Sequence, residues 1–266
     1  MTNPTRTTAL ITGASSGIGA VYADRLARRG HDLVLVARDA ARLTGVAEAA
    51  AQHGVAVETM RADLAAPADL RRVEARLRGD GAIALLVNNA GVGVAPGLVD
   101  ADADALEQMI KVNVTAPTRL AAAAATAFAA AGRGAIINIS SVLALAPELY
   151  SGVYSGTKSF LLNLSTSLRH ELSSRNVRVQ AVLPGATRTG FWTSAGGSAD
   201  DLPREMVMDV EELVDAALCG FDAGEDVTIP SLPDPADWTA FDAARSRLGP
   251  NLSRQHAAAR YRRLAA

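Results

Sequence analysis

The stretch that decides the fold is Thr12-Gly13-Ala14-Ser15-Ser16-Gly17-Ile18-Gly19. It follows a strand-like apolar run, Thr8–Thr12, and opens a helix-like segment at about Gly17–Arg29. Glycines at such a junction let backbone amides approach a phosphate, and the helix amino terminus adds partial positive charge. The spacing Gly-x-x-x-Gly-x-Gly is one residue longer than the usual dinucleotide fingerprint. A glycine-rich turn without a ligand is the alternative, but the position after the first strand favours a nucleotide site.

Strand-like and helix-like runs alternate along the rest of the chain. Several strand candidates are apolar without alternation, as expected for strands that are covered on both faces. The predicted strands are Thr8–Thr12, Asp32–Ala37, Ala56–Arg61, Ala82–Asn88, Ala135–Ser140, Val177–Leu183 and Val227–Ile229. The predicted helices are about Gly17–Arg29, Ala40–His53, Pro67–Arg78, Asp102–Ala130, Val153–Ser174 and Val210–Ala223, with Asp39 as the N-cap of the second. Repeated strand–helix–strand units predict an α/β fold, a doubly wound, parallel, seven-stranded Rossmann-type sheet in a single domain.

Two regions depart from this alternation. Residues 185–208 follow the sixth predicted strand, and much of this segment is rich in Gly, Ser, Thr and Asp. We expect them to form a lid that orders over a substrate. Residues 231–266 contain Pro233, Pro235 and Pro250 before an arginine-rich, helix-like end. The expected organisation is therefore a nucleotide-binding and catalytic domain over residues 1–230, with the lid inside it, and a C-terminal extension over 231–266.

The composition limits the classes of partner. A net charge of −2 and a pI near 6.1 give no electrostatic reason to expect nucleic acid or an anionic membrane. The polar first eight residues argue against a signal peptide, and Leu120–Ala131 is too short and too weakly hydrophobic to span a bilayer. Cys219 is the only cysteine, which suits a reducing compartment. We expect a cytoplasmic protein.

The four histidines do not indicate a metal site. They never cluster with Cys, Asp or Glu at the spacing that metal ligands require. These residues are His31, His53, His170 and His256. We therefore predict no bound metal.

A tyrosine and a rare lysine point to acid/base chemistry. The chain has 26 Lys and Arg residues, yet only Lys111 and Lys158 are lysines. Lys158 follows Tyr154 by four residues, so on a helix the two side chains share a face. A nearby ammonium should lower the phenol's pKa from its usual value of about 10. Ser141 lies thirteen residues before the tyrosine, at the end of an apolar run.

The end of the second predicted strand bears on the choice of cofactor. Chains that bind NAD usually place a carboxylate there, where it holds the ribose 2′-hydroxyl. Here Ala37 is followed by Arg38, whose planar guanidinium offers a donor fork to a 2′-phosphate. A solvated surface arginine is the alternative, but we expect NADP(H) in preference to NAD(H).

The order of these motifs resembles the short-chain dehydrogenase/reductase family, in the shorter-chain, NADP-type branch. The resemblance rests on the glycine loop, Asn88-Asn89-Ala90-Gly91, Asn113, Ser141 and Tyr154-x-x-x-Lys158, and it covers about residues 7 to 230. Each motif is modest alone, whereas their joint order and spacing are specific. The chain runs more than thirty residues beyond the last predicted strand, which is further than a minimal member. This departure puts the family's common tetramer in doubt.

The resemblance implies roles for four residues. Tyr154 would give a proton to the carbonyl oxygen or accept one from the alcohol. Lys158 would hold the nicotinamide ribose and lower the tyrosine pKa, and Ser141 would donate a hydrogen bond to the substrate oxygen. Asn113 would arrange a water that links Lys158 to solvent.

The resemblance also implies a set of cofactor contacts. Asp63 and Leu64 would lie against the adenine, Thr187 near the nicotinamide carboxamide and Thr189 near the pyrophosphate. The full set is Gly13, Ser15, Ser16, Gly17, Ile18, Gly19, Arg38, Asp63, Leu64, Asn89, Ala90, Gly91, Tyr154, Lys158, Pro184, Gly185, Thr187 and Thr189.

Together these features predict an NADP-dependent oxidoreductase that interconverts a carbonyl and an alcohol. Apolar residues in the segments around the expected pocket favour a hydrophobic ketone, aldehyde or acyl chain, although they could equally be loop packing. They are Val92, Val94, Leu143, Leu145, Pro147, Leu149, Phe191, Trp192, Met206 and Met208. The alternatives are a catalytically idle NADP-binding protein and a structural protein on the same fold. The resemblance implies a homodimer or homotetramer. We expect Ser140 to be structural, Tyr150 to be a pocket wall or surface residue, and Lys111 to be solvated.

Overall fold

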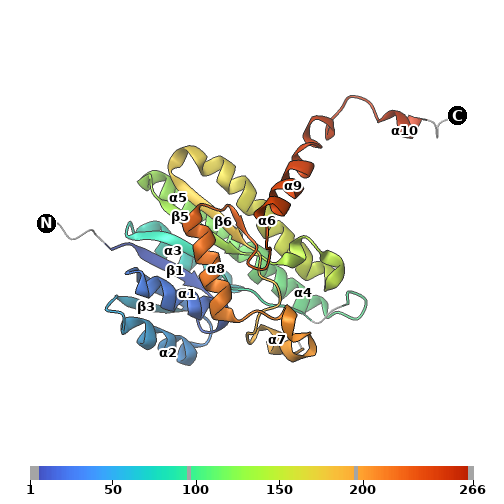
Figure 1. The fold of residues 1–266 in the computed structure, drawn as a ribbon. Helices are drawn as coiled ribbons and strands as arrows, with labels where there is room; N and C mark the ends of the chain where they lie inside the picture. Colours follow the sequence, from blue (N-terminus) through green and yellow to red (C-terminus); the bar gives the residue numbers. More distant parts are fainter. Residues whose placement is uncertain (1–5, 95–96, 195–196, 263–266) are drawn as a thin grey trace. The chain divides into compact units, whose positions relative to one another are not determined.

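The computed structural model describes residues 6–94, 97–194 and 197–262. Within them, the strands form one parallel sheet in the order β3-β2-β1-β4-β5-β6-β7 (Figure 1). The strands are β1 (Thr8–Thr12), β2 (Asp32–Ala37), β3 (Val57–Arg61), β4 (Ile83–Asn88), β5 (Gly134–Ile139), β6 (Val177–Val182) and β7 (Val227–Thr228). The predicted doubly wound parallel sheet of seven strands is confirmed, with bounds that differ by one residue where they differ at all.

Helices cover both faces of the sheet. One face packs against α1 (Gly17–Arg28), α2 (Ala40–Ala51) and α8 (Val210–Ala223), and the other against α3 (Pro67–Gly79), α5 (Ala116–Ala131) and α6 (Gly152–Leu172) (Figure 1). Adjacent strand residues point to opposite layers, because side chains alternate along a strand. In β1, Ile11 belongs to the first layer and Leu10 to the second, and both are fully buried. The continuous apolar runs of the sequence therefore serve two cores at once.

The helix expected over Asp102–Ala130 is not continuous. It is divided into α4 (Ala103–Ile110), a π-helical turn at Lys111–Thr115, and α5. Pro117 has no N–H to offer the carbonyl four residues before it, so the regular α-helical hydrogen bond to Asn113 is missing. Such π-turns often occur at functional sites. Here the turn lies around Asn113, which is buried.

The expected lid is partly helical. Residues 185–208 contain α7 (Phe191–Ser194) and short 3₁₀ turns at Ala199–Asp201 and Arg204–Met206, while 195 and 196 lie outside the described residues. Its two ends are joined at the base: the Met208 amide donates to the Ala186 carbonyl at 2.9 Å, and the Arg188 amide donates to the Met208 carbonyl at 3.0 Å. The segment therefore leaves and re-enters the domain at one place.

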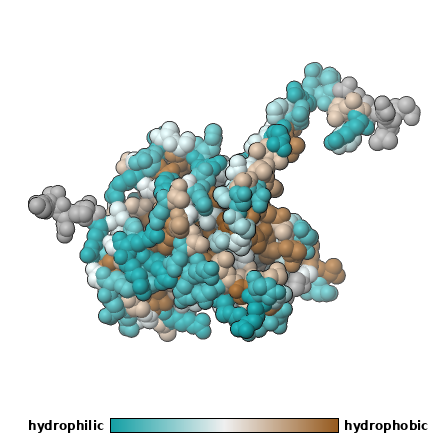
Figure 2. Space-filling view, viewed as in Figure 1, coloured by the Kyte–Doolittle hydropathy of each residue, from teal (hydrophilic) through white to brown (hydrophobic). Residues whose placement is uncertain are grey.

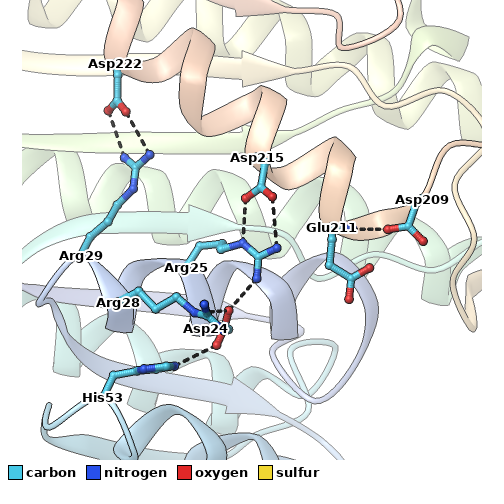
Figure 3. A network of polar contacts seen from close by, with 9 residues as sticks. All are labelled: Asp24, Arg25, Arg28, Arg29, His53, Asp209, Glu211, Asp215 and Asp222. Atoms are coloured by element: carbon cyan, nitrogen blue, oxygen red, sulfur yellow. Dashed lines mark hydrogen bonds and ion pairs between the residues drawn. The ribbon is translucent and has the colours of Figure 1, made fainter.

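Ion pairs fix α8, which follows the lid, against α1 (Figure 3). Arg25 forms a two-pronged pair with Asp215, at 2.7 and 3.1 Å. Arg29 forms another with Asp222, at 3.0 and 2.9 Å. Each partly exposed pair contributes modestly, about 0.2–1 kcal/mol, but planar two-pronged geometry also fixes direction. These pairs therefore join α8, the helix that follows residues 185–208, to α1, the helix that begins at the glycine loop.

The described residues divide into two compact units after Pro230. The second unit contains α9 (Pro235–Ser246), a 3₁₀ turn at Gly249–Asn251 and α10 (Ala259–Arg262). We did not expect α9 from the sequence, where the prolines suggested irregular chain. In fact Asp234 caps the helix by accepting the Ala236 amide at 2.8 Å, and Pro235 occupies the first turn, where its missing N–H costs nothing.

A buried hydroxyl in α1 leads to a stability prediction. Tyr22 is fully buried, and its hydroxyl has no hydrogen-bond partner among the described residues. We expect Tyr22→Phe to leave the free energy of unfolding unchanged or raise it by about 1 kcal/mol, because an unsatisfied polar group is removed at almost constant shape. Tyr22→Ala should cost about 3 kcal/mol or more through the cavity it leaves. Urea unfolding measures both, and a loss above about 1 kcal/mol in Tyr22→Phe would contradict the assignment.

Candidate active site

The glycine loop lies at the carboxyl edge of the sheet, where β1 meets α1. Gly13 and Gly17 have φ angles of 66° and 54°, in the left-handed region that favours glycine. A Cβ on Gly19 would stand 2.4 Å from the Gly13 carbonyl oxygen, so no larger residue fits there. Ser16 precedes the helix in extended conformation, and its side chain makes no capping hydrogen bond. These residues form a tight backbone cradle at a helix amino terminus, which fits a pyrophosphate.

Thr12 and Asn89 brace this loop from behind. The Thr12 hydroxyl accepts the amides of Asn89 and Ala90, at 3.0 and 3.1 Å, and donates to the Val87 carbonyl at 3.3 Å. The Asn89 amide group donates to the carbonyls of Thr12 and Gly13, at 2.9 and 3.3 Å. Asn89 is thus a support of the loop as well as a predicted neighbour of the nucleotide. Thr12 begins the glycine-rich stretch in the sequence but had no predicted role, although a polar residue at the end of a buried strand was the available signal.

Tyr154, Lys158 and Ser141 come together as expected. Tyr154 and Lys158 lie one turn apart on α6, with 7% and 5% of their surfaces exposed. Ser141 follows β5, and its hydroxyl accepts the Leu143 amide at 3.1 Å. The Lys158 ammonium lies 5.6 Å from the Tyr154 ring centroid and donates to the Ile139 carbonyl at 3.0 Å.

The expected lowering of the Tyr154 pKa is wrong for this structure. Burial raises the pKa of the phenol above its usual value, the charge of Tyr150 adds to the rise, and a hydrogen bond with Ser141 only partly offsets it. Burial also lowers the pKa of Lys158, to about 8. The Lys158 ammonium donates to the Ile139 carbonyl, and its charge does not offset the burial of the phenol. Desolvation therefore outweighs any attraction between the two side chains.

Asn113 connects the loop after β4 to α6. Its side chain accepts the Val92 amide at 2.9 Å and donates to the Val92 carbonyl at 2.9 Å and to the Thr157 hydroxyl at 3.2 Å. Thr157 in turn donates to the Tyr154 carbonyl at 2.7 Å. The Ser140 hydroxyl, just after β5, donates to the carbonyl of Lys158 on α6 at 2.7 Å, in keeping with a structural role. Helix α6 is thus held at two successive residues, Thr157 and Lys158.

The segment after β6 forms the opposite wall. The Pro184 carbonyl accepts the Val142 amide at 2.9 Å and the Ser141 hydroxyl at 3.5 Å, which brings Pro184 and Gly185 beside the predicted catalytic serine. Thr189 lies near the glycine loop, because a Cβ on Gly17 would stand 3.2 Å from its methyl group. Thr187 is buried, and its hydroxyl donates to the Gly185 carbonyl at 3.0 Å. This wall therefore reaches both the glycine loop and Ser141.

The residues expected at the adenosine end lie after β2 and β3. Arg38 is exposed, whereas Leu64 is buried. Asp63 stabilises its own turn, since its carboxylate accepts the Ala65 amide at 3.0 Å. One further residue emerges from the structure: Arg61, the last residue of β3, donates from Nε to the Arg38 carbonyl at 3.3 Å. Sequence reasoning did not single it out, because only strand pairing brings it beside Arg38.

Aromatic rings surround the Tyr154 ring. Tyr150 meets it edge-on with centroids 5.7 Å apart, and Phe191 of the lid lies tilted at 5.6 Å. The Tyr150 hydroxyl donates to the Val94 carbonyl at 3.2 Å, and the Trp192 indole donates to the Thr187 carbonyl at 2.8 Å. This places Tyr150 as a wall of the site and shows how the lid helix is anchored.

Apolar side chains also reach the surface of this unit. Brown surface gathers in Figure 2 over the region where Figure 1 draws α4 and the end of α6. Single-domain proteins rarely leave several large apolar side chains exposed together without a partner or ligand. The exposed large apolar residues of the first unit are Leu98, Val99, Ile110, Leu145, Leu149, Phe160 and Met206.

The chemistry of the site fits a nicotinamide dinucleotide better than a metal. The glycine cradle offers backbone amides and a helix amino terminus to a phosphate, and the buried Tyr154 and Lys158 lie one turn apart on α6. Within the described part of the chain, no three His, Cys, Asp or Glu residues come together as metal ligands. Nor does that part contain a helix long and apolar enough to cross a membrane.

Comparison with known proteins places this geometry in a family. Residues 7–198 match the family model for short chain dehydrogenase. The chain is 54% identical to a short-chain dehydrogenase from Sphingobium yanoikuyae solved in complex with NADPH, over 96% of this chain and 100% of that one, with a TM-score of 0.93. It is 48% identical to a bulky-bulky ketone specific alcohol dehydrogenase from Comamonas testosteroni, over 97% and 99% of the two chains, with a TM-score of 0.89.

A curated relative agrees with the two solved structures. An oxidoreductase of Staphylococcus saprophyticus is 32% identical over 212 residues, which cover 79% of this chain and 88% of the relative. The family model alone spans well over half of the chain, and the two solved structures match it almost from end to end. The chain belongs to the short-chain dehydrogenase/reductase family and is an NAD(P)-dependent oxidoreductase that acts on alcohols and carbonyls.

Proposed function

We propose that the chain interconverts a bulky, hydrophobic ketone or aldehyde and its alcohol with NADP(H), using Tyr154 as the general acid and base. The observation that carries this proposal is the buried phenol of Tyr154, with Ser141 hydrogen-bonded to it and Lys158 one turn away. A phenol with a raised pKa holds its proton through the neutral range, so it is ready to protonate a carbonyl oxygen.

Each of the other residues supports that proton transfer. NADP(H) supplies the hydride when it is bound. Ser141 donates a hydrogen bond to the substrate oxygen as negative charge develops there, which favours the transition state over the ground state. Lys158 would hold the nicotinamide ribose through its amine. Asn113 fixes the loop and helix that position both side chains and connects Lys158 to solvent through a water.

The substrate class follows from the walls of the site. Tyr150 and Phe191 present aromatic rings to the Tyr154 ring, and Leu149, which directly precedes Tyr150 in the chain, is exposed. An aromatic or aliphatic group on each side of a carbonyl would find apolar contact there, at about 25 cal/mol for each Å² of apolar surface removed from water. The Comamonas testosteroni relative, described as specific for bulky-bulky ketones, supports the same class. The lid at 185–208 would close over this substrate.

NADP(H) is the preferred cofactor in this proposal. Arg38 stands after β2 where a carboxylate would otherwise receive the ribose hydroxyls, and it is free to meet a 2′-phosphate. The Sphingobium yanoikuyae relative was solved with NADPH, which supports binding of the phosphorylated cofactor. A homodimer or homotetramer in the cytoplasm completes the proposal. The lone Cys219 suits that compartment.

Replacing the acid provides the first test. Tyr154→Phe should lower kcat by about three orders of magnitude, since general acid/base catalysis contributes about 10²–10⁴-fold, while the Kd for NADPH changes less than about threefold. Turnover is followed by NADPH absorbance and binding by fluorescence titration. Tyr150→Phe is the matched control, because it removes a neighbouring hydroxyl and leaves the ring. Near-wild-type turnover in Tyr154→Phe would contradict the assignment.

The pKa of Lys158 predicts a pH dependence of cofactor binding. Burial lowers that pKa to about 8, so the ammonium is charged below this pH and neutral above it. NADPH binding through the charged form should be full below pH 8 and weaken as pH rises through 8, by up to about tenfold per pH unit. Fluorescence titration from pH 7 to 9.5 measures the Kd. Lys158→Met should bind more weakly with a flat profile, and a flat wild-type profile would refute the role.

The lid aromatic tests the substrate class. Phe191→Ala should lower kcat/KM for a ketone with two large groups, such as an aryl cyclohexyl ketone, by about tenfold, because the lost ring removes apolar contact. The value for a small ketone such as acetone should change little. Phe241→Ala, in the second unit, removes an equally large aromatic side chain as a control. Equal losses for both ketones would show that Phe191 acts on the fold or lid rather than on specificity.

A further inference from the structure

Two arginines from neighbouring strands stand side by side at the adenosine end of the site. Strand pairing sets Arg61, the last residue of β3, opposite Ala37, the last residue of β2. The Arg61 Nε then donates to the carbonyl of Arg38, the next residue, at 3.3 Å. Both arginines are exposed. The guanidinium of Arg61 is thereby held against the backbone of the residue on which the NADP preference rests.

We infer that Arg61 is a second determinant of 2′-phosphate recognition, which works beside Arg38. This inference rests on the proposed preference for NADP(H) and extends it to a residue outside the family's motifs. A phosphate dianion has three terminal oxygens and two negative charges, so two guanidinium groups match it better than one. Arg61 uses Nε for the Arg38 carbonyl, which leaves its two terminal nitrogens for the phosphate.

The nearby carboxylates are committed elsewhere. Asp39 accepts the Arg42 amide at 3.0 Å and pairs with the Arg42 guanidinium at 3.4 Å. Asp69 accepts the Asp63 amide at 2.8 Å and pairs with Arg72 at 3.7 Å. Within the described part of the chain, no carboxylate pairs with the guanidinium of Arg38 or Arg61.

The backbone of Arg61 is fixed as well. The guanidinium of Arg72, on α3, donates to the Arg61 carbonyl at 2.6 Å. Arg61 is therefore held through its carbonyl by a helix and through its side chain by the neighbouring strand. A pre-positioned donor loses less rotamer entropy on binding than a free surface arginine. Of the two arginines, Arg61 is thus the one whose position is set before the ligand arrives.

Binding of nucleotide fragments tests this without turnover. Calorimetry with 2′,5′-ADP and with 5′-AMP isolates the 2′-phosphate from the rest of the cofactor. Arg61→Gln should weaken the binding of 2′,5′-ADP about tenfold and the binding of 5′-AMP less than twofold, as expected for one lost charge-assisted contact. Arg61→Lys should fall between wild type and Arg61→Gln, because it keeps the charge and loses the fork. The tenfold effect should shrink as salt rises from 50 to about 500 mM.

Arg133→Gln is the matched control. Arg133 also donates to a backbone carbonyl, that of Gly81 at 3.1 Å, but it stands at the amino edge of the sheet beside β5. Arg133→Gln removes one positive charge, as Arg61→Gln does, and should leave the affinities for 2′,5′-ADP and 5′-AMP unchanged. If Arg61→Gln weakens the binding of both fragments equally, or of neither, the inference is overturned while the NADP preference stands. If the wild-type protein binds both fragments equally, the NADP preference itself fails.

Discussion

The Thr12 hydroxyl joins the end of β1 to the end of β4, at the edge of the sheet where the candidate site lies. The strand order reverses at β1, so the connections after β1 and β4 diverge to opposite faces of the sheet. One hydroxyl spans this divergence, because it accepts the amides of Asn89 and Ala90 and donates to the Val87 carbonyl. Asn89 returns two hydrogen bonds to the glycine loop. The glycine loop and the loop after β4 are consequently joined by a continuous set of hydrogen bonds.

Desolvation governs the electrostatics of the chemical centre. Tyr154 and Lys158 are both buried, and burial disfavours the charged form of each, which raises the pKa of the phenol and lowers that of the ammonium. The Ile139 carbonyl compensates the lysine without help from a carboxylate. Burial therefore leaves Tyr154 neutral and brings the pKa of Lys158 close to the physiological range.

The sequence was sufficient to predict the features that depend on residues close together in the chain. Alternating strand and helix patterns predicted the sheet, and the order of Gly13, Ser141, Tyr154 and Lys158 predicted a candidate site. It failed where distant contacts decide. The hydrogen bonds of Asn113 join it to Val92, 21 positions away, and the raised pKa of Tyr154 comes from burial by segments that are distant in the sequence. The role of Arg61 could not be predicted from the sequence, because strand register, rather than spacing along the chain, places it beside Arg38.

The near absence of lysine gives this protein an unusual surface. Its cationic side chains are almost all guanidinium groups, and of the two lysines only Lys111, which is half-buried, reaches the surface, where it pairs with Glu107 at 2.8 Å. Acylation and other amine-directed reactions require a neutral amine, which guanidinium groups do not provide at physiological pH. The surface charge is therefore almost immune to lysine acetylation. The amine with the lowered pKa is the buried Lys158, so a small acylating reagent would report on access to the nucleotide site rather than on the surface.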